Sequence, residues 1–414
     1  MRLSIPRVVP ILMGLTAAAF GFGTPTASAQ AAPPATDPLG VSQSAAAPAN
    51  PVVRTPSAEA RRTAPATSRS LNVNVTSCSE SDLQAAIGAV ATVGGTVNLR
   101  RGCTYTLTDA VPPNDDNGLP VITNRVTING YGDTITRAAT AANFRFFEID
   151  GPSGNLTLNA LTLSNGHASS GLGNGRGGAI WLQGGGSALT LNNSRLTTNT
   201  ADTFGGAIDN DNGTVSVSSS TLYDNTAGRA GGAVFVSPFG GSGTATVDRS
   251  RIAGNHAATL AGGIAAAVGT KVTLTSTQLS SNDVIGTNAQ GGGIAQAGTM
   301  TLKRSTVMGN STSGNNAQGG GIFNTGSGTV QLTDSPVTGN TANGTNSRGG
   351  GIFNTGSGTV ALNRSPVIKN RALGTGADGG GIFNASGTVT LTASPVIGNQ
   401  PNNCGSPSTV PGCF

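Results

Sequence analysis

The sequence predicts an all-β fold, a single-stranded right-handed parallel β-helix of about ten coils with an N-terminal capping helix and disulfide-closed ends. The first observation is a Gly-Gly-x-aliphatic motif, whose aliphatic residue recurs at steps of 26–30 residues: Ile180, Ile208, Val234, Ile264, Ile294, Ile322, Ile352 and Ile382. The second is an asparagine that keeps the same period: Asn199, Asn225, Asn255, Asn282, Asn310, Asn340, Asn370 and Asn399. Two independent motifs with one period indicate a repeat array.

Aligning the repeats on this asparagine reveals the strands. The residues ten and eight positions before it are apolar, and the residues between them are mostly small and polar, which is the period-two pattern of a half-buried strand. A further aliphatic residue lies three positions before the asparagine. Together with the Gly-Gly-x-aliphatic column, these positions predict about three short strands per coil. Right-handedness follows from the crossover rule for parallel strands.

Other repeated residues have predicted structural roles. The asparagine column is expected to form a ladder, because stacked amides hydrogen-bond from coil to coil. Phe323, Phe353 and Phe383 are expected to form a stack, which we interpret as packing rather than as a platform for sugar rings. Pro336, Pro366 and Pro395 share one column and are expected at a strand start or corner, because proline cannot donate to the backbone ladder.

The chain divides into five predicted regions. Residues 1–29 combine a charged start, an apolar run and the Ala27-Ser28-Ala29 pattern of a signal peptide cleavage site. An Ala/Pro/Ser/Thr-rich stretch over residues 30–70 is typical of a disordered linker. The N-terminal cap is expected over 71–120, the β-helix over 121–400 and the C-terminal disulfide cap over 401–414. We therefore expect a secreted, extracellular protein with no transmembrane segment after signal cleavage.

The ends of the array are predicted to be closed. Cys78 and Cys103 lie near its start and Cys404 and Cys413 at its end, and pairing within each end is expected because a solenoid holds its ends apart. Residues 79–87 have the pattern of a capped amphipathic helix that would cover the first coil.

Several motifs resemble those of a known family. The helix is followed by Gly-Gly-Thr-Val-Asn-Leu (94–99) and Cys-Thr-Tyr-Thr-Leu (103–107), which resemble the N-terminal cap of secreted bacterial right-handed parallel β-helix repeat proteins of the pectate-lyase-like superfold. The Gly-Gly-Ala-Ile copies are similar to repeats of chlamydial polymorphic outer-membrane proteins, although Phe-Asn replaces the Phe-x-x-Asn of that family. The resemblance covers residues 71–414 and implies a fold rather than a function.

The charge distribution limits the partners. From residue 71 onward the chain has 17 Lys plus Arg against 16 Asp plus Glu, a net charge of +1. A nearly neutral folded region argues against nucleic-acid binding. The expected partners are extracellular polysaccharides or the cell envelope, and we expect a monomer.

Candidate catalytic residues are few. No glutamate follows Glu148, and the aspartates beyond residue 160 do not share columns on adjacent coils, whereas glycosidic hydrolysis needs paired carboxylates. His167 and His256 are predicted to be isolated. The nearest candidate is a possible ligand stripe of outward residues: Asp248, Arg249, Lys303, Arg304, Asp334 and Arg364. Because Asp334 falls between two arginines of its column, we interpret the stripe as a surface ionic ladder, with polyanion contact and lyase chemistry as alternatives.

No cofactor is expected. Asp209 and Asp211, within Asp-Asn-Asp-Asn-Gly (209–213), are weak candidate calcium ligands, but the composition is that of a turn.

Outward threonines form a second possible surface. The pairs Thr214/Ser216, Thr244/Thr246, Thr299/Thr301 and Thr388/Thr390 lie in ranks that Lys271, Gln331 and Ala361 interrupt. Such ranks suit ice or crystalline polysaccharide, although threonine also favours solvated strands.

These observations favour a secreted, non-catalytic protein that binds glycans, adheres or coats the cell envelope. The alternatives are a polysaccharide lyase or glycoside hydrolase of the pectin-lyase-like fold, and an ice-binding protein.

Overall fold

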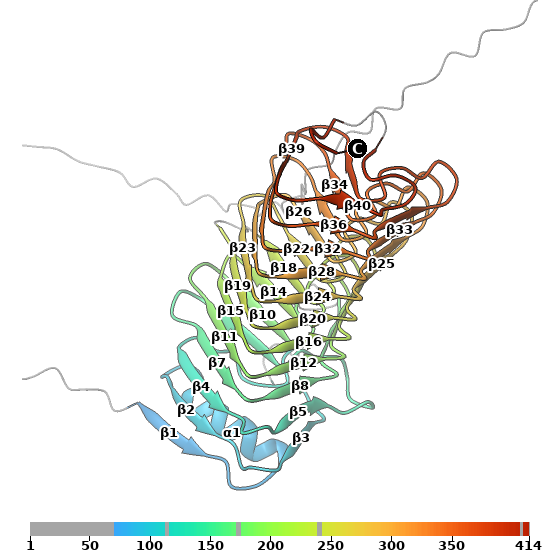
Figure 1. Cartoon of the computed structure of the whole chain (residues 1–414). Coiled ribbons are helices and arrows are strands. Elements are labelled where there is room, and N and C mark those ends of the chain that lie inside the picture. Colours follow the sequence, from blue (N-terminus) through green and yellow to red (C-terminus); the bar gives the residue numbers. More distant parts are fainter. Residues whose placement is uncertain (1–69, 112–115, 171–174, 238–241, 406–408, 414) are drawn as a thin grey trace, which may run out of the picture. The chain divides into compact units, whose positions relative to one another are not determined.

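The computed structural model describes residues 70–111, 116–170, 175–237, 242–405 and 409–413. Within these ranges the chain is an all-β parallel solenoid of about ten coils, with one helix near its N-terminal end and a disulfide near each end (Figure 1). The predicted fold class is therefore confirmed. No helix of these segments is long and apolar enough to cross a membrane.

The strands form four parallel sheets, each built from one strand of successive coils. The twelve-stranded sheet contains β1 (Leu71–Asn74), β2 (Gly95–Asn98), β4 (Arg125–Asn129), β7 (Asn155–Asn159), β11 (Ala188–Asn192), β15 (Thr214–Ser218), β19 (Thr244–Asp248), β23 (Lys271–Thr275), β27 (Thr299–Lys303), β31 (Thr329–Thr333), β35 (Thr359–Asn363) and β39 (Thr388–Thr392). The eleven-stranded sheet contains β3 (Thr104–Leu107), β5 (Thr134–Arg137), β8 (Thr162–Ser164), β12 (Arg195–Thr197), β16 (Thr221–Tyr223), β20 (Arg251–Ala253), β24 (Gln278–Ser280), β28 (Thr306–Met308), β32 (Val337–Thr338), β36 (Val367–Ile368) and β40 (Val396–Ile397).

The two remaining sheets complete each coil. The nine-stranded sheet contains β6 (Phe147–Asp150), β10 (Ile180–Gln183), β14 (Ile208–Asp211), β18 (Val234–Ser237), β22 (Ile264–Ala266), β26 (Ile294–Gln296), β30 (Ile322–Asn324), β34 (Ile352–Asn354) and β38 (Ile382–Asn384). The eight-stranded sheet contains β9 (His167–Ala168), β13 (Thr200–Ala201), β17 (Thr226–Ala227), β21 (His256–Ala257), β25 (Asp283–Ile285), β29 (Ser311–Ser313), β33 (Thr341–Asn343) and β37 (Arg371–Leu373). A complete coil thus contains four strands, one more than the three predicted from the sequence.

The core lies between the sheets. The aliphatic columns found in the sequence point inward, and one continuous cluster of buried side chains extends from Val75 to Cys413. In the column of the twelve-stranded sheet that contains Leu274 and Leu302, exposure is 0–3% from Leu191 to Leu362. Burial of this column drives the stacking of each coil on the next.

The Gly-Gly pair has a steric cause. The first glycine of the pair adopts a left-handed conformation, as at Gly205 with φ +63°. A Cβ on the next residue, Gly206, would lie 2.1 Å from the carbonyl oxygen of Gly232 on the neighbouring coil. Larger residues at these two positions would therefore strain the backbone or separate the coils.

A second corner follows the twelve-stranded sheet. One residue per coil, with φ between 44° and 50°, turns the chain there: Ala160, Asn193, Ser219, Arg249, Ser276, Arg304, Asp334, Arg364 and Ala393. The proline column lies just after this corner, because Pro336, Pro366 and Pro395 directly precede β32, β36 and β40.

Both ends carry the predicted caps. Helix α1 (Glu80–Ala91) begins at Ser79, whose hydroxyl accepts a hydrogen bond from the Asp82 backbone N–H at 3.2 Å, and it buries Leu83, Ile87 and Val90. Cys78 is bonded to Cys103, and Cys404 to Cys413. The expected helix and the expected pairing are confirmed. Residues 1–69, which include the expected signal peptide and nearly all of the linker, lie outside the described residues.

Candidate functional site

The predicted ligand stripe lies on the exposed corner after the twelve-stranded sheet. Arg364 donates hydrogen bonds to both carboxylate oxygens of Asp334, at 2.7 and 2.9 Å, and this contact holds the pKa of Asp334 below its ordinary value. Arg304 acts on Asp334 only through its charge. The stripe therefore contains local ion pairs rather than one ladder.

The rest of the stripe is equally open to solvent. Asp248 pairs with its sequence neighbour Arg249 at 2.8 Å, and the Arg249 side chain is 66% exposed. Lys303 ends β27 two coils away, opposite Thr275 and Thr333. Solvent screens such pairs, so they contribute little to stability.

The repeated asparagines form a fully buried ladder. In each step, from Asn199 to Asn399, the side-chain amide donates to the side-chain oxygen of the next asparagine at 2.9–3.0 Å. The same oxygen also accepts the backbone N–H of the preceding ladder residue, as Asn310 does for Asn282 at 3.0 Å. These side chains hold the corner between the eleven- and eight-stranded sheets and are unavailable to a ligand.

Asp209 and Asp211 occupy a different place from the predicted turn. They lie in β14, with Asp209 beside Trp181 of β10 and Phe235 of β18 on the outward side of the nine-stranded sheet. The turn interpretation was wrong for the two aspartates because the Gly-Gly-x-aliphatic register continues through β14: Asp209 follows Ile208 as Trp181 follows Ile180. The chain turns only after the strand, at Asn212 with φ 70° and Gly213.

Both aspartates bind one arginine. Arg176 Nε donates to Asp209 at 2.7 Å, and Arg176 Nη1 donates to Asp211 at 2.9 Å. The second Asp209 oxygen faces Arg176 Nη2 at 3.4 Å, and the second Asp211 oxygen accepts from Ser237 at 2.9 Å. A calcium ion at this pair would have to displace these donors. The expectation of no cofactor, with Asp209 and Asp211 as weak calcium candidates, stays a prediction.

A second arginine extends the cluster by one coil. Arg145 is 1% exposed, donates to Asn117 Oδ1 at 2.8 Å and to the Arg176 carbonyl at 3.1 Å, and lies 3.5 Å from Glu148. Asn117 in turn donates to Glu148 at 2.9 Å. We call the set Asn117, Arg145, Glu148, Arg176, Trp181, Asp209 and Asp211 the buried ionic cluster.

Aromatic rings line this cluster. The guanidinium carbons of Arg145 and Arg176 lie 5.0 and 5.9 Å from the centre of the Trp181 ring. Phe204 and Phe235 stack with centroids 4.6 Å apart. The indole N–H of Trp181 is buried and has no hydrogen-bond partner in the described part of the chain.

Burial and charge act in opposite directions in the cluster. Burial lowers the pKa of Arg176, but the charges and hydrogen bonds of Asp209 and Asp211 outweigh it and leave that pKa raised. Burial prevails at three other groups. It raises the pKa of Asp209 to about 6, against the opposing effect of Arg176, and it also raises the pKa of Asp211. Burial likewise lowers the pKa of Arg145, although Glu148 opposes it. Perturbed carboxyl groups beside arginines are typical of functional sites, but structural networks produce them too.

Both histidines are paired, contrary to the prediction that they are isolated. His167 Nε2 lies 3.0 Å from Asp202, and His256 Nδ1 lies 2.9 Å from Asp283 on the next coil. Partial burial raises the pKa of Asp202, but hydrogen bonds from His167 and Ser170 outweigh it and leave that pKa below its ordinary value. The hydrogen bond to Asp283 raises the pKa of His256.

The outward face of the twelve-stranded sheet carries the threonine ranks. At its central position the strand register aligns eight hydroxyl side chains on successive coils without interruption: Thr96, Thr127, Thr157, Thr190, Ser216, Thr246, Thr273 and Thr301. Gln331 and Ala361 then interrupt this rank. We call these eight residues the hydroxyl rank; seven are half-buried and Thr246 is exposed.

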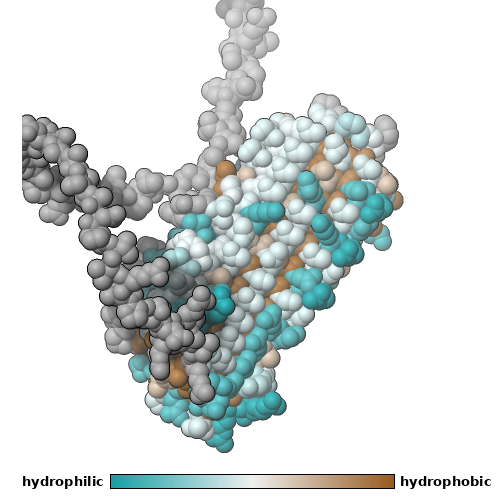
Figure 2. Space-filling view, turned by 90° about the vertical axis from the view of Figure 1, so that its left-hand side faces the viewer, coloured by the Kyte–Doolittle hydropathy of each residue, from teal (hydrophilic) through white to brown (hydrophobic). Residues whose placement is uncertain are grey.

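An amide ladder that sequence alignment missed runs beside this rank. Asn98, Asn129, Asn159 and Asn192 lie two residues further along their strands, and each donates to the preceding side-chain oxygen at 2.8–2.9 Å. Four successive coils therefore present the same Thr-x-Asn pattern. Figure 2 looks onto this side, where rows of side chains of near-neutral hydropathy cross the face and hydrophilic ones gather towards a margin.

Comparison with known proteins gives similarities of backbone only. No family model and no curated protein matches the chain. Among solved structures, the surface adhesin PfbA of Streptococcus pneumoniae is 13% identical, with a TM-score of 0.42 over 78% of this chain and 91% of that one. The A-module of the mannuronan C-5 epimerase AlgE6 of Azotobacter vinelandii is 13% identical, with a TM-score of 0.40 over 79% of this chain and 96% of that one. At such identity the likeness concerns the course of the chain and not the side chains of a site.

Proposed function

We propose that this chain is an exported, non-catalytic β-helix protein that binds ordered, hydroxyl-rich polysaccharides of the cell envelope through the outward face of its twelve-stranded sheet. The observation that carries the proposal is the unbroken hydroxyl rank with the amide ladder beside it.

The spacing of this face suits a regular polymer. Neighbouring coils lie about 4.8 Å apart, and alternate residues along a strand lie about 6.7 Å apart. Hydroxyl and amide groups thus form a two-dimensional grid of donors and acceptors. Polysaccharide chains packed side by side present hydroxyl groups with a comparable regularity, so many weak contacts can form at once and add up to avidity.

The side chains of the grid are held in place before a ligand arrives. Threonine is branched at Cβ and has few χ1 rotamers. The amides of Asn129 and Asn159 are fixed by hydrogen bonds to their neighbours at 2.8–2.9 Å. Little conformational entropy remains to be lost on binding, which favours affinity from individually weak contacts.

The central rank carries no charge, which favours a neutral ligand. Charged residues of this face lie in the flanking columns, at Arg125, Lys271, Asp248 and Lys303. Desolvation of a hydroxyl costs far less than desolvation of an ion, so the centre of the face can be covered by a sugar surface at a modest cost.

The test measures binding of the purified exported chain to insoluble glucan, chitin and mannan by depletion from solution. Thr246→Tyr and Thr190→Tyr each place a ring above the rank, and we expect each to weaken binding about tenfold or more. The matched control is Thr221→Tyr, the same change at a half-buried outward position of β16 on the eleven-stranded sheet. Equal losses in all three variants would contradict the proposed face.

Ice is the competing ligand for this face, because it also presents a regular array of hydrogen-bonding groups. Absence of polymer binding, together with thermal hysteresis that Thr301→Tyr abolishes, would replace polysaccharide by ice as the ligand of this face.

A second candidate function rests on the buried ionic cluster rather than on the predicted stripe. Burial raises the pKa of Asp209 to about 6. This acid bonds to Arg176 and is the strand neighbour of Trp181, whose indole N–H has no hydrogen-bond partner among the described residues. All three side chains are buried, so a polysaccharide would reach them only if the cluster opened. Such a set suits the cleavage of an acidic polysaccharide. Turnover of pectate, alginate or chondroitin that Asp209→Asn abolishes and Asp334→Asn leaves intact would favour this enzyme over a binding protein.

A further inference from the structure

We propose that copies of this chain associate head to tail, with the free edge of β39 in one copy pairing with the free edge of β1 in the next. The twelve-stranded sheet would then continue from copy to copy. This goes beyond the proposed function and replaces the monomer expected from the sequence.

The two end strands of this sheet each have a neighbour on one side only. Among the described strands, β1 pairs with β2 and β39 pairs with β35. The C-terminal cap covers other parts of the last coil: Cys404 bridges to Ile382 of β38, and Gln400 bridges to Arg371 of β37. The cap thus continues the nine- and eight-stranded sheets. No described cap residue forms a strand pair with β39, although Val410 and Cys413 lie in the same buried cluster as Val389.

The backbone groups at the two free edges are complementary. In β1 and in Val75, which follows it, the backbone groups of the inward-facing residues form the hydrogen bonds to β2. The Val75 N–H, for example, donates to the Asn98 carbonyl at 2.9 Å. Strand alternation therefore directs the N–H and C=O groups of Asn72 and Asn74 to the free edge. In β39, the outward-facing Thr388 donates back towards β35, to the Gly358 carbonyl at 2.9 Å, which leaves Val389 and Leu391 at the free edge.

A five-residue register satisfies both edges. Pairing residues 388–392 of one copy with 72–76 of the next repeats the pattern seen between β35 and β39. Asn74 N–H would donate to the Val389 carbonyl, and Leu391 N–H would donate to the Asn74 carbonyl. The inward-facing side chains of the two copies would then be neighbours. Val389 would lie next to Val73 of the next copy, and Leu391 next to Val75.

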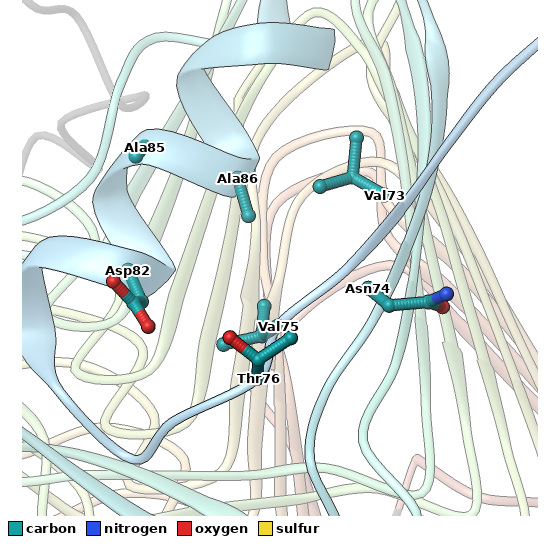
Figure 3. A pocket seen from close by; sticks show the side chains of 7 residues that line it. All are labelled: Val73, Asn74, Val75, Thr76, Asp82, Ala85 and Ala86. Atoms are coloured by element: carbon teal, nitrogen blue, oxygen red, sulfur yellow. The ribbon is translucent and has the colours of Figure 1, made fainter.

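The core is incompletely covered at these two places. Leu391 is only half-buried, whereas the preceding residues of its column are 0–3% exposed. At the other end, a depression of about 270 Å³ lies between β1 and α1, and Figure 3 shows the side chains around it: Val73, Asn74, Val75, Thr76, Asp82, Ala85 and Ala86. Leu391 of another copy would add apolar contact at this depression.

Helix α1 packs beside β1 at the end where the next copy would dock. Its exposed surface carries the small residues Ala85, Gly88 and Ala89, which allow another chain to come close. Exposed sheet edges are sites where strands from other chains add. Because the two edges differ, the contact is heterologous and does not close on itself, so it generates linear assemblies.

The experiment uses sedimentation velocity of the full exported chain over a wide range of concentration. Wild type should show mass that increases with concentration. Asn74→Pro removes the free-edge N–H of β1 and no backbone hydrogen bond to β2; it also removes the exposed side-chain bond from Asn98 to Asn74, whereas the bond from Asn98 to Asn72 stays. Leu391→Glu places a charge at the free edge of β39. Each variant alone should remain monomeric, and circular dichroism checks that each is folded.

Mixing the two variants separates the proposal from misfolding. The Asn74→Pro chain keeps an intact β39 edge, and the Leu391→Glu chain keeps an intact β1 edge. An equimolar mixture should therefore form dimers that neither variant forms alone. A monomeric wild type at all concentrations, self-association that survives in either variant, or a mixture without dimers would each overturn the head-to-tail contact.

Discussion

Replacing Asn310 by alanine tests what the buried asparagine ladder contributes. The Asn310 side chain makes four hydrogen bonds that alanine removes. Its oxygen accepts the backbone N–H and the side-chain amide of Asn282, at 3.0 and 2.9 Å. Its amide donates to the Leu279 carbonyl at 3.2 Å and to Asn340 at 2.9 Å. The site is fully buried, so water does not replace these partners.

The magnitude follows from the groups left behind. Two buried donors on Asn282 lose their acceptor, and each orphaned donor costs about 1–3 kcal/mol. The two acceptors lose one bond each, but Asn340 still accepts the backbone N–H of residue 310 at 2.9 Å. We therefore expect Asn310→Ala to lower the free energy of unfolding by about 4 kcal/mol.

The matched control is Asn159→Ala in the half-buried amide ladder beside the hydroxyl rank. Asn159 also bonds to the asparagines above and below it, both at 2.9 Å, but it is only half-buried. Water can satisfy the partners that it leaves, so the expected loss is below about 1 kcal/mol. The assay is guanidinium unfolding followed by far-ultraviolet circular dichroism. Equal losses in the two variants would refute the argument that burial gives the ladder its strength.

Three further predictions follow from the ends and the surface. Loss of the Cys78–Cys103 bridge, which spans 25 residues, should lower stability by about 3.5 kcal/mol, and loss of Cys404–Cys413, which spans 9, by about 2.6 kcal/mol, measured by unfolding of the paired serine variants. The pKa of His256 should lie above 6.5 in an NMR titration and should return towards 6.5 in Asp283→Asn. The stabilising contribution of the His256–Asp283 pair is complete below pH 6.5 and is lost as the pH rises through the raised pKa. Asp334→Ala should leave the melting temperature nearly unchanged, since the Asp334–Arg364 pair is exposed; a large decrease would show that the surface pair stabilises the fold.

Much of the fold could be predicted from the sequence because each coil repeats the same constraints. The Gly-Gly corner, the inward columns around Leu274 and the Asn282 column each recur at one period, so a single alignment places them all. The fourth strand of each coil could not be predicted, because strands such as Thr200–Ala201 are too short to show a period-two pattern.

The buried ionic cluster was missed for a different reason. Arg176 meets Asp209 and Asp211 across one coil, a contact 33 and 35 residues apart in sequence, and no periodic pattern marks it. One signal was present: alignment on Ile180 and Ile208 places Asp209 in a strand column, which argues against a turn. The pairing of His256 with Asp283 was visible in the same way, since each directly follows a ladder asparagine.

The coil-on-coil hydrogen bonding also determines how the molecule would respond to force. Every inter-coil backbone bond runs along the direction in which the coils stack, and equivalent ladder residues such as Asn310 and Asn340 are 30 residues apart. Tension applied to the chain ends would break one coil interface at a time rather than all of them together. Each rupture would release about 100 Å of extended chain. In a force–extension curve, the rupture peaks should therefore be evenly spaced by about this length.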